Sequence, residues 1–89
     1  MARSRRPGAI YEPDYVYLAT KLREAREESG LTQAQVARYL GKASSYVSKV
    51  ELRERYLDAM VLKQLADLYE KPLEFFYLPR DKTGRRAKG

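Results

Sequence analysis

The stretch LTQAQVARYLGKASSYVSKVE, residues 31–51, decides the fold, because it predicts two short helices joined by a tight turn. Thr32 stands where a helix N-cap is expected, and Gln35, three residues further on, completes a capping box. The apolar face of this first helix consists of Val36, Ala37 and Leu40. Gly41 then ends the helix, so that a second helix follows within a few residues.

The second helix of this pair has two unlike faces. Val47 and Val50 recur at helical spacing and form its apolar face. The opposite, polar face consists of Ser44, Ser45, Ser48 and Lys49. Short hydroxyls and one cation suit base edges in the major groove of DNA, so these four residues are the candidates for base reading. The alternative is a helical hairpin whose polar face meets only water.

Further residues extend this pattern from Leu22 to Phe76. They are Leu22, Arg23, Arg26, Leu31, Thr32, Gln33, Val36, Ala37, Leu40, Gly41, Tyr46, Val47, Ser48, Lys49, Val50, Glu51, Glu54, Arg55, Leu62, Leu65, Ala66, Leu73 and Phe76. At these spacings the chain resembles the DNA-binding domain of the Cro/phage-repressor family, also called the XRE family. The resemblance implies an all-α, five-helix, repressor-like domain that binds double-stranded DNA as a transcriptional regulator.

Composition limits the other possibilities. Eighty-nine residues with 44% hydrophobic content allow one small domain. The chain has no cysteine and no histidine, which excludes disulfides, thiolate zinc sites and Cys or His nucleophiles, so we expect neither an enzyme nor a cofactor. No apolar run reaches the length of a transmembrane helix or a signal-peptide core, so the expected location is the cytoplasm, away from membranes.

The formal charge of +6 is unevenly distributed along the chain. Residues 1–8 and 80–89 together hold eight of the 18 basic residues and one of the 12 acidic residues, which leaves ten basic and eleven acidic residues in 9–79. We therefore expect a disordered basic arm (1–8), a helix-turn-helix domain (9–79) and a disordered basic tail (80–89). Bulk attraction for DNA resides in these two tails.

Capping signals and periodicity predict five helices inside the domain. The first three are expected at about 14 to 29, 33 to 40 and 44 to 52. Asp58 is the expected N-cap of the fourth helix, which reaches Tyr69. Pro72 starts the fifth helix in its first turn, and Pro79 closes the fold.

Phosphate contacts are expected around the helix pair. The resemblance assigns Gln33 to this role, since its amide lies at a helix N-terminus where free N–H groups attract anions. An ordinary solvated glutamine is the alternative. The other candidates for phosphate binding are Thr32, Lys42, Tyr46, Arg53 and Arg55. For Tyr46, packing against the protein is equally compatible with its place between the buried and polar faces.

Three positions depart from the family pattern. Ala43 replaces the usual Ser or Thr N-cap, at about 1 kcal/mol, unless the helix starts on Ser44, which would then cap and not read a base. Ser44 also replaces a glutamine that can read adenine. Arg53 replaces glycine, so either Arg53 adopts a left-handed conformation or the helix continues through it.

Arg26 and Glu51 are paired in the family, and we expect a structural ion pair that sets the angle of the second helix. Two independent surface charges are the alternative. The aromatic residues Phe75 and Tyr77 are candidates for a homodimer seam, unless this segment only covers the monomer core. No small-molecule effector is expected. The competing hypothesis for function is a protein-interaction adaptor or antitoxin-like module on the same fold.

Overall fold

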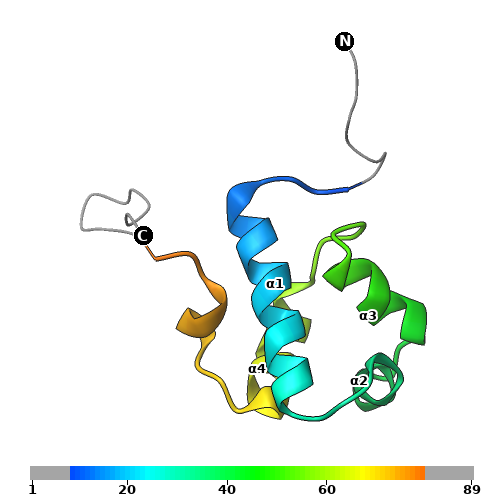
Figure 1. Ribbon diagram of the computed structural model, residues 1–89. Coiled ribbons are helices and arrows are strands. Elements are labelled where there is room, and N and C mark those ends of the chain that lie inside the picture. The colour runs from blue at the N-terminus through cyan, green and yellow to red at the C-terminus, as the bar shows by residue number, and fades with distance from the viewer. Residues whose placement is uncertain (1–8, 80–89) are drawn as a thin grey trace.

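A computed structural model describes residues 9–79, which fold into helices without any β-strand in that range (Figure 1). The elements are α1 (Pro13–Glu28), α2 (Gln33–Leu40), α3 (Ser44–Glu51), α4 (Ala59–Tyr69) and the 3₁₀ turn η1 (Leu73–Phe76). None of the helices in this range is both long enough and apolar enough to cross a bilayer. The all-α prediction is confirmed.

The helix pair begins as its sequence predicts. The Gln35 N–H donates to Thr32 Oγ1 at 3.0 Å, and the Thr32 N–H donates to Gln35 Oε1 at 2.8 Å, so both halves of the capping box are present. α3 begins differently, because Ala43 is its N-cap and provides no side-chain bond. Ser44 is therefore the first helical residue and does not act as the cap.

All four α-helices in 9–79 end in the same hydrogen-bonded turn, in which a left-handed residue follows the helix. Gly30 and Gly41 take this position after α1 and α2, with φ of 72° and 71°. Arg53 and Glu70 take it after α3 and α4, with φ of 64° and 57°. α3 therefore stops at Glu51 and does not continue through Arg53, although a side chain costs about 1 kcal/mol in this conformation.

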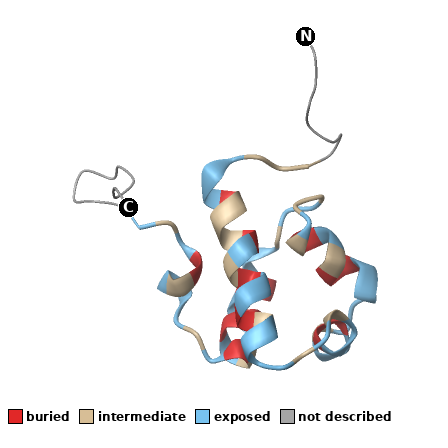
Figure 2. Cartoon of the chain, in the orientation of Figure 1, coloured by how far each residue is buried: buried red, intermediate tan, exposed pale blue. Residues whose placement is uncertain are grey.

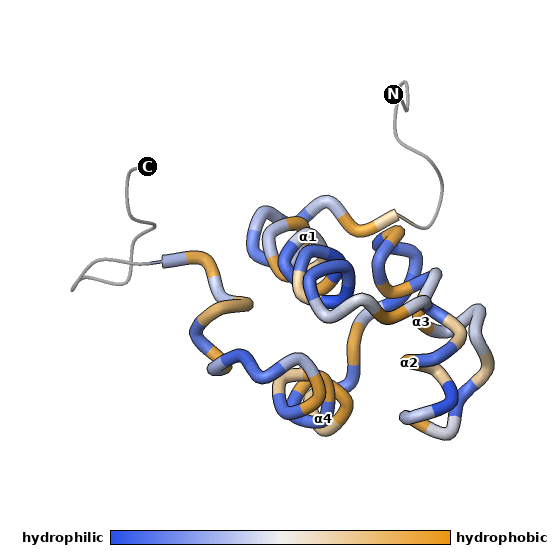
Figure 3. Tube along the Cα trace, turned by 60° about the horizontal axis from the view of Figure 1, so that its bottom comes forward, coloured by the Kyte–Doolittle hydropathy of each residue, from blue (hydrophilic) through white to orange (hydrophobic). Residues whose placement is uncertain are grey.

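The core lies where the inner faces of the helices meet, shown in red in Figure 2. Leu22 of α1, Val36 of α2 and Phe76 of η1 are its largest fully buried side chains. α4 contributes Val61, Leu62, Leu65, Ala66 and Tyr69. Apolar and polar stretches alternate along the helices in Figure 3, as expected where each helix turns one side inward.

The predicted fifth helix is wrong in kind, because η1 is a single 3₁₀ turn of four residues. Tyr77 already has extended backbone angles, with φ of −106° and ψ of 137°. Pro79 disfavours helical geometry at the residue before it, so the chain between the two prolines is too short for an α-helix. Burial of the Phe76 ring, which is 0% exposed, holds this turn against α1 and the core instead.

Candidate nucleic-acid interface

α3 presents a polar face to solvent. Ser44, Ser45 and Lys49 are exposed and Ser48 is half-buried, whereas Val47 and Val50 of the same helix are buried. All four residues predicted to read bases are thus on the accessible side of one helix. The packing of α3 against α2 leaves this side uncovered within the described residues.

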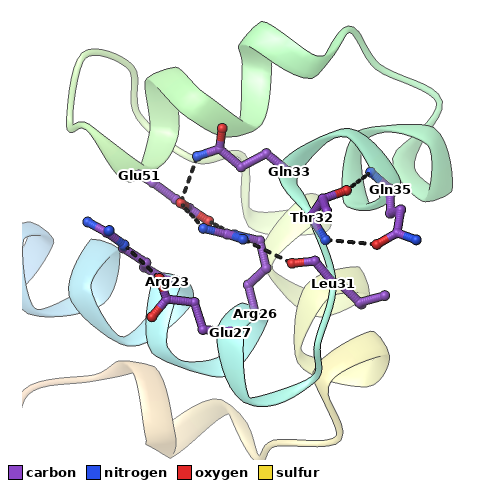
Figure 4. Close-up of polar contacts among 8 residues, drawn as sticks. All are labelled: Arg23, Arg26, Glu27, Leu31, Thr32, Gln33, Gln35 and Glu51. Atoms are coloured by element: carbon purple, nitrogen blue, oxygen red, sulfur yellow. Dashed lines mark hydrogen bonds and ion pairs between the residues drawn. The ribbon is translucent and has the colours of Figure 1, made fainter.

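The orientation of α3 depends on a buried ion pair with α1 (Figure 4). Arg26 Nε donates to Glu51 Oε2 at 2.7 Å and Arg26 Nη2 donates to Glu51 Oε1 at 3.1 Å, so the guanidinium fork engages both carboxylate oxygens. The side chains are only 12% and 6% exposed. Arg26 Nη1 also donates to the Leu31 carbonyl at 2.9 Å, which links the pair to the segment before α2. The hydrogen bond from Glu51 raises the pKa of Arg26.

Gln33 belongs to the same network. Its Nε2 donates to Glu51 Oε1 at 3.0 Å, so the first residue of α2 and the last residue of α3 are bonded directly. Sequence reasoning expected a phosphate contact here, whereas the structure gives the side chain a protein partner. One Nε2 hydrogen and the backbone N–H groups of the first helical turn are left for an anion, because the first N–H groups of a helix have no intrahelical acceptor.

Tyr46 is part of the core, which contradicts the expected phosphate contact. Its side chain is 7% exposed and its buried hydroxyl has no hydrogen-bond partner among the described residues. Lys42 Nζ and Arg55 Cζ lie 4.9 and 4.8 Å from the centroid of its ring. The ring therefore holds two exposed cations by cation–π attraction, one from the turn before α3 and one from the loop after it.

Arg53 also has an unforeseen partner. Its Nη1 donates to the Ile10 carbonyl at 2.8 Å, and its guanidinium carbon lies 4.9 Å from the centroid of the Tyr11 ring. Sequence reasoning placed this cation on a phosphate, but it spans to the segment that precedes α1. Thr32, in contrast, is exposed and uses its hydroxyl oxygen as the α2 cap.

Tyrosine side chains at the same place went unassigned by sequence reasoning. The Tyr15 hydroxyl donates to the Arg55 carbonyl at 2.8 Å, and burial raises the pKa of Tyr15 to about 12. The Tyr56 hydroxyl donates to Glu12 Oε1 at 3.1 Å, and the rings of Tyr15 and Tyr56 pack edge to face at 5.2 Å. The abundance of tyrosine, eight in 89 residues, was the available signal.

The candidate dimer residues differ in accessibility. Phe75 is half-buried against Phe76, with Lys21 Nζ and Lys71 Nζ 5.2 and 4.8 Å from the centroid of its ring. Tyr77 is 51% exposed. A cavity of about 340 Å³ next to it is lined by Glu12, Asp14, Tyr15, Leu18, Tyr77 and Leu78. The predicted arm (1–8) and tail (80–89) lie outside the described residues.

Comparison with known proteins gives this geometry a context. The sequence profile described as helix-turn-helix matches residues 22–76. The crystal structure of the restriction-modification controller protein C.AhdI from Aeromonas hydrophila is 28% identical, with a TM-score of 0.64 over 71% of this chain and 91% of that chain. The crystal structure of the DNA-binding domain of BldD is 24% identical, with a TM-score of 0.65 over 76% of this chain and 99% of that domain.

An enzyme shares the same helical arrangement. Hydroxypropylphosphonic acid epoxidase from S. wedmorenis is 19% identical, with a TM-score of 0.66 over 88% of this chain. The match spans only 43% of the epoxidase chain, so it shows a shared fold and nothing of the chemistry. No curated protein matches the sequence significantly.

Proposed function

The chain belongs to the XRE-type helix-turn-helix family of DNA-binding transcription regulators, and from this premise we propose that it recognises a specific double-stranded operator with α3 in the major groove. Ser44, Ser45, Ser48 and Lys49 read base edges in this proposal. The observation that carries it is the exposed hydroxyl-and-lysine face of α3, presented by a helix whose other face is buried.

Phosphate contacts surround this face in the proposal. Lys42 and Arg55 are exposed cations at the two ends of α3, and both lie over the Tyr46 ring, which limits their freedom before DNA arrives. Thr32 and Gln33 offer the first N–H groups of α2 to a phosphate between them. Residues 9–79 carry a net charge of −1, so these local cations and the two basic tails supply the attraction.

The acting species in this proposal is a homodimer on a two-fold operator. One recognition helix makes too few contacts for operator affinity, whereas two related by a two-fold axis reach half-sites roughly 34 Å apart. Tyr77 and the adjoining cavity supply an accessible apolar surface for the second copy. The likeness to a restriction-modification controller supports a regulatory role for the chain.

Selection of bound duplexes from a random DNA pool tests the proposal. We expect a recurring pseudo-palindromic sequence, a footprint covering two half-sites, and binding that weakens steeply as salt increases. If the selected pool has no consensus and removal of both tails abolishes all DNA binding, α3 does not read DNA. That result would favour the protein-interaction adaptor on the same fold.

A further inference from the structure

The segment that precedes α1 is fastened to the loop that follows α3. Ile10 N–H donates to the Arg53 carbonyl at 2.7 Å, and Arg53 Nη1 donates back to the Ile10 carbonyl at 2.8 Å. These two residues, 43 positions apart in the chain, therefore close a hydrogen-bonded ring. The guanidinium lies 4.9 Å from the centroid of the Tyr11 ring, which adds a cation–π contact to the ring of hydrogen bonds.

Tyrosine contacts extend this attachment toward α1. Tyr56 in the same loop donates its hydroxyl to Glu12, and Tyr15 donates its hydroxyl to the Arg55 carbonyl. The attachment thus joins residues 10–15 to residues 53–56 through both backbone and side chains, and we call it the N-terminal clamp. Figure 1 shows the chain before α1 running beside the loop that leaves α3.

The backbone of Arg53 explains how the clamp forms. At φ 64° the residue ends α3, while its N–H still bonds to the Val50 carbonyl at 3.1 Å. Its own carbonyl is thereby turned to Ile10. Glycine would adopt this conformation without strain, but it has no guanidinium to return a bond to Ile10. A strained arginine persists where its surroundings over-determine it, and here the clamp does so.

The clamp decides where residues 1–8 join the fold. These residues carry Arg3, Arg5 and Arg6, and they are covalently continuous with Ala9 and Ile10. Their attachment point therefore lies at the C-terminal end of α3. A tether of fixed origin raises the local concentration of its charges at nearby phosphates, whereas a tether whose root is free dilutes it.

We propose that Arg53 is a positioning residue that fixes the root of residues 1–8 beside α3, so that Arg3, Arg5 and Arg6 bind the DNA backbone flanking the groove that α3 occupies. This inference rests on the proposed function. It removes Arg53 from the direct phosphate contacts, because its half-buried guanidinium already bonds to Ile10 and lies over Tyr11.

A double-mutant cycle on DNA affinity tests the proposal. The four proteins are the full chain, Arg53→Gly, the chain lacking residues 2–8, and the combination, each titrated with the selected duplex at one salt concentration. Glycine keeps the left-handed turn, so Arg53→Gly retains the fold. We expect Arg53→Gly to weaken binding about three- to tenfold in the full chain and less than about twofold in the shortened chain.

Arg55→Ala is the matched control, because it removes a neighbouring exposed cation whose guanidinium is outside the clamp. It should weaken binding by the same factor with and without residues 2–8. If Arg53→Gly behaves like this control, Arg53 is itself a phosphate contact and the proposal is overturned. Equal binding by Arg53→Gly and the full chain would also overturn it.

Hydrogen exchange of the Ile10 amide gives a readout that needs no DNA. Loss of the guanidinium bond should speed this exchange by about tenfold in Arg53→Gly, while amides in the α4 core stay protected. Unchanged Ile10 exchange would contradict the positioning role. If the full chain selects no DNA at all, the proposed function fails as well, whereas binding without coupling in the cycle overturns this inference alone.

Discussion

Glu51, the last residue of α3, accepts two hydrogen bonds from Arg26 of α1, at 2.7 and 3.1 Å, and a third from Gln33 of α2 at 3.0 Å. One carboxylate thus joins the three helices that determine how the polar face of α3 is presented. Burial of this charge is tolerated because the hydrogen bonds compensate for lost hydration. Its main contribution is to geometry, since a buried ion pair adds little net stability over an apolar replacement.

Removing one partner of this pair should be worse than removing both. Arg26→Ala or Glu51→Ala leaves a buried charge uncompensated, and each should lower the free energy of unfolding by roughly 3 kcal/mol. The double mutant should be less damaged than the sum, with a coupling of about 1–3 kcal/mol. Urea unfolding of the four proteins measures this coupling. Additive losses would mean that the two side chains act independently.

Base reading predicts position-dependent effects on DNA affinity. Ser45→Ala and Lys49→Ala should each cost about 1–3 kcal/mol at the base pair that the side chain contacts, and little elsewhere. Competition with duplexes that vary one base pair at a time locates these effects. Lys63→Ala, on an exposed cation of α4, is the control and should leave the ranking unchanged. A loss that is equal for all sequences would reassign Ser45 and Lys49 to phosphates.

The hydroxyls of Tyr46 and Tyr15 should respond in opposite ways to removal. Tyr46→Phe deletes a buried hydroxyl without a partner among the described residues and keeps the ring between Lys42 and Arg55, so stability should stay equal or increase by up to about 1 kcal/mol. Tyr15→Phe removes a hydroxyl that donates at 2.8 Å and should cost about 1 kcal/mol. Thermal unfolding compares the two. A larger loss for Tyr46→Phe would reveal a partner for its hydroxyl.

Local signals account for what could be predicted from the sequence. α2 runs from 33 to 40 as predicted, because Thr32 and Gln35 cap its start and Gly41 supplies the left-handed residue at its end. The Arg26–Glu51 contact was expected only through family resemblance, since two charges 25 positions apart carry no local signal. The same family pattern did not include the bond from Gln33 to Glu51.

Contacts that depend on tertiary packing escaped prediction. Tyr46 sits at the boundary between two faces of α3, where periodicity alone cannot separate burial from exposure. The bonds between Ile10 and Arg53 use backbone atoms far apart in the chain, so no residue type announces them. The segment after Pro72 has helix-like composition, but the packing of Phe76 and the constraint before Pro79 decide its form.

Glu70 offers a test of strain at a helix end. Its φ of 57° is unfavourable for a residue with a side chain, and its carboxylate also lies at the negative end of the α4 dipole. Glu70→Gly should stabilise the fold by about 1 kcal/mol, which raises Tm by roughly 4–8 °C in a domain of this size. Glu70→Ala removes the charge but keeps the strain, and should gain less. Equal gains would assign the whole effect to charge.

The basic tail should add affinity without adding specificity. Residues 80–89 carry five cations and one aspartate, and such segments bind phosphates by releasing counterions, largely without reading sequence. Deleting them should weaken binding to every duplex by a similar factor and reduce the salt slope by about 0.9 for each phosphate that the tail neutralises. Titrations over a series of salt concentrations, on the best and a scrambled duplex, measure both effects.

A variant with Arg85 and Arg86 changed to Gln keeps the length of the tail and isolates its charge, so it should show part of the same decrease in slope. The ranking of duplexes should survive in both proteins, because the base-reading residues of α3 are intact. An unchanged slope after deletion would place the phosphate contacts within 9–79, despite its net charge of −1. Loss of all sequence preference would mean that the tail, rather than α3, discriminates between duplexes.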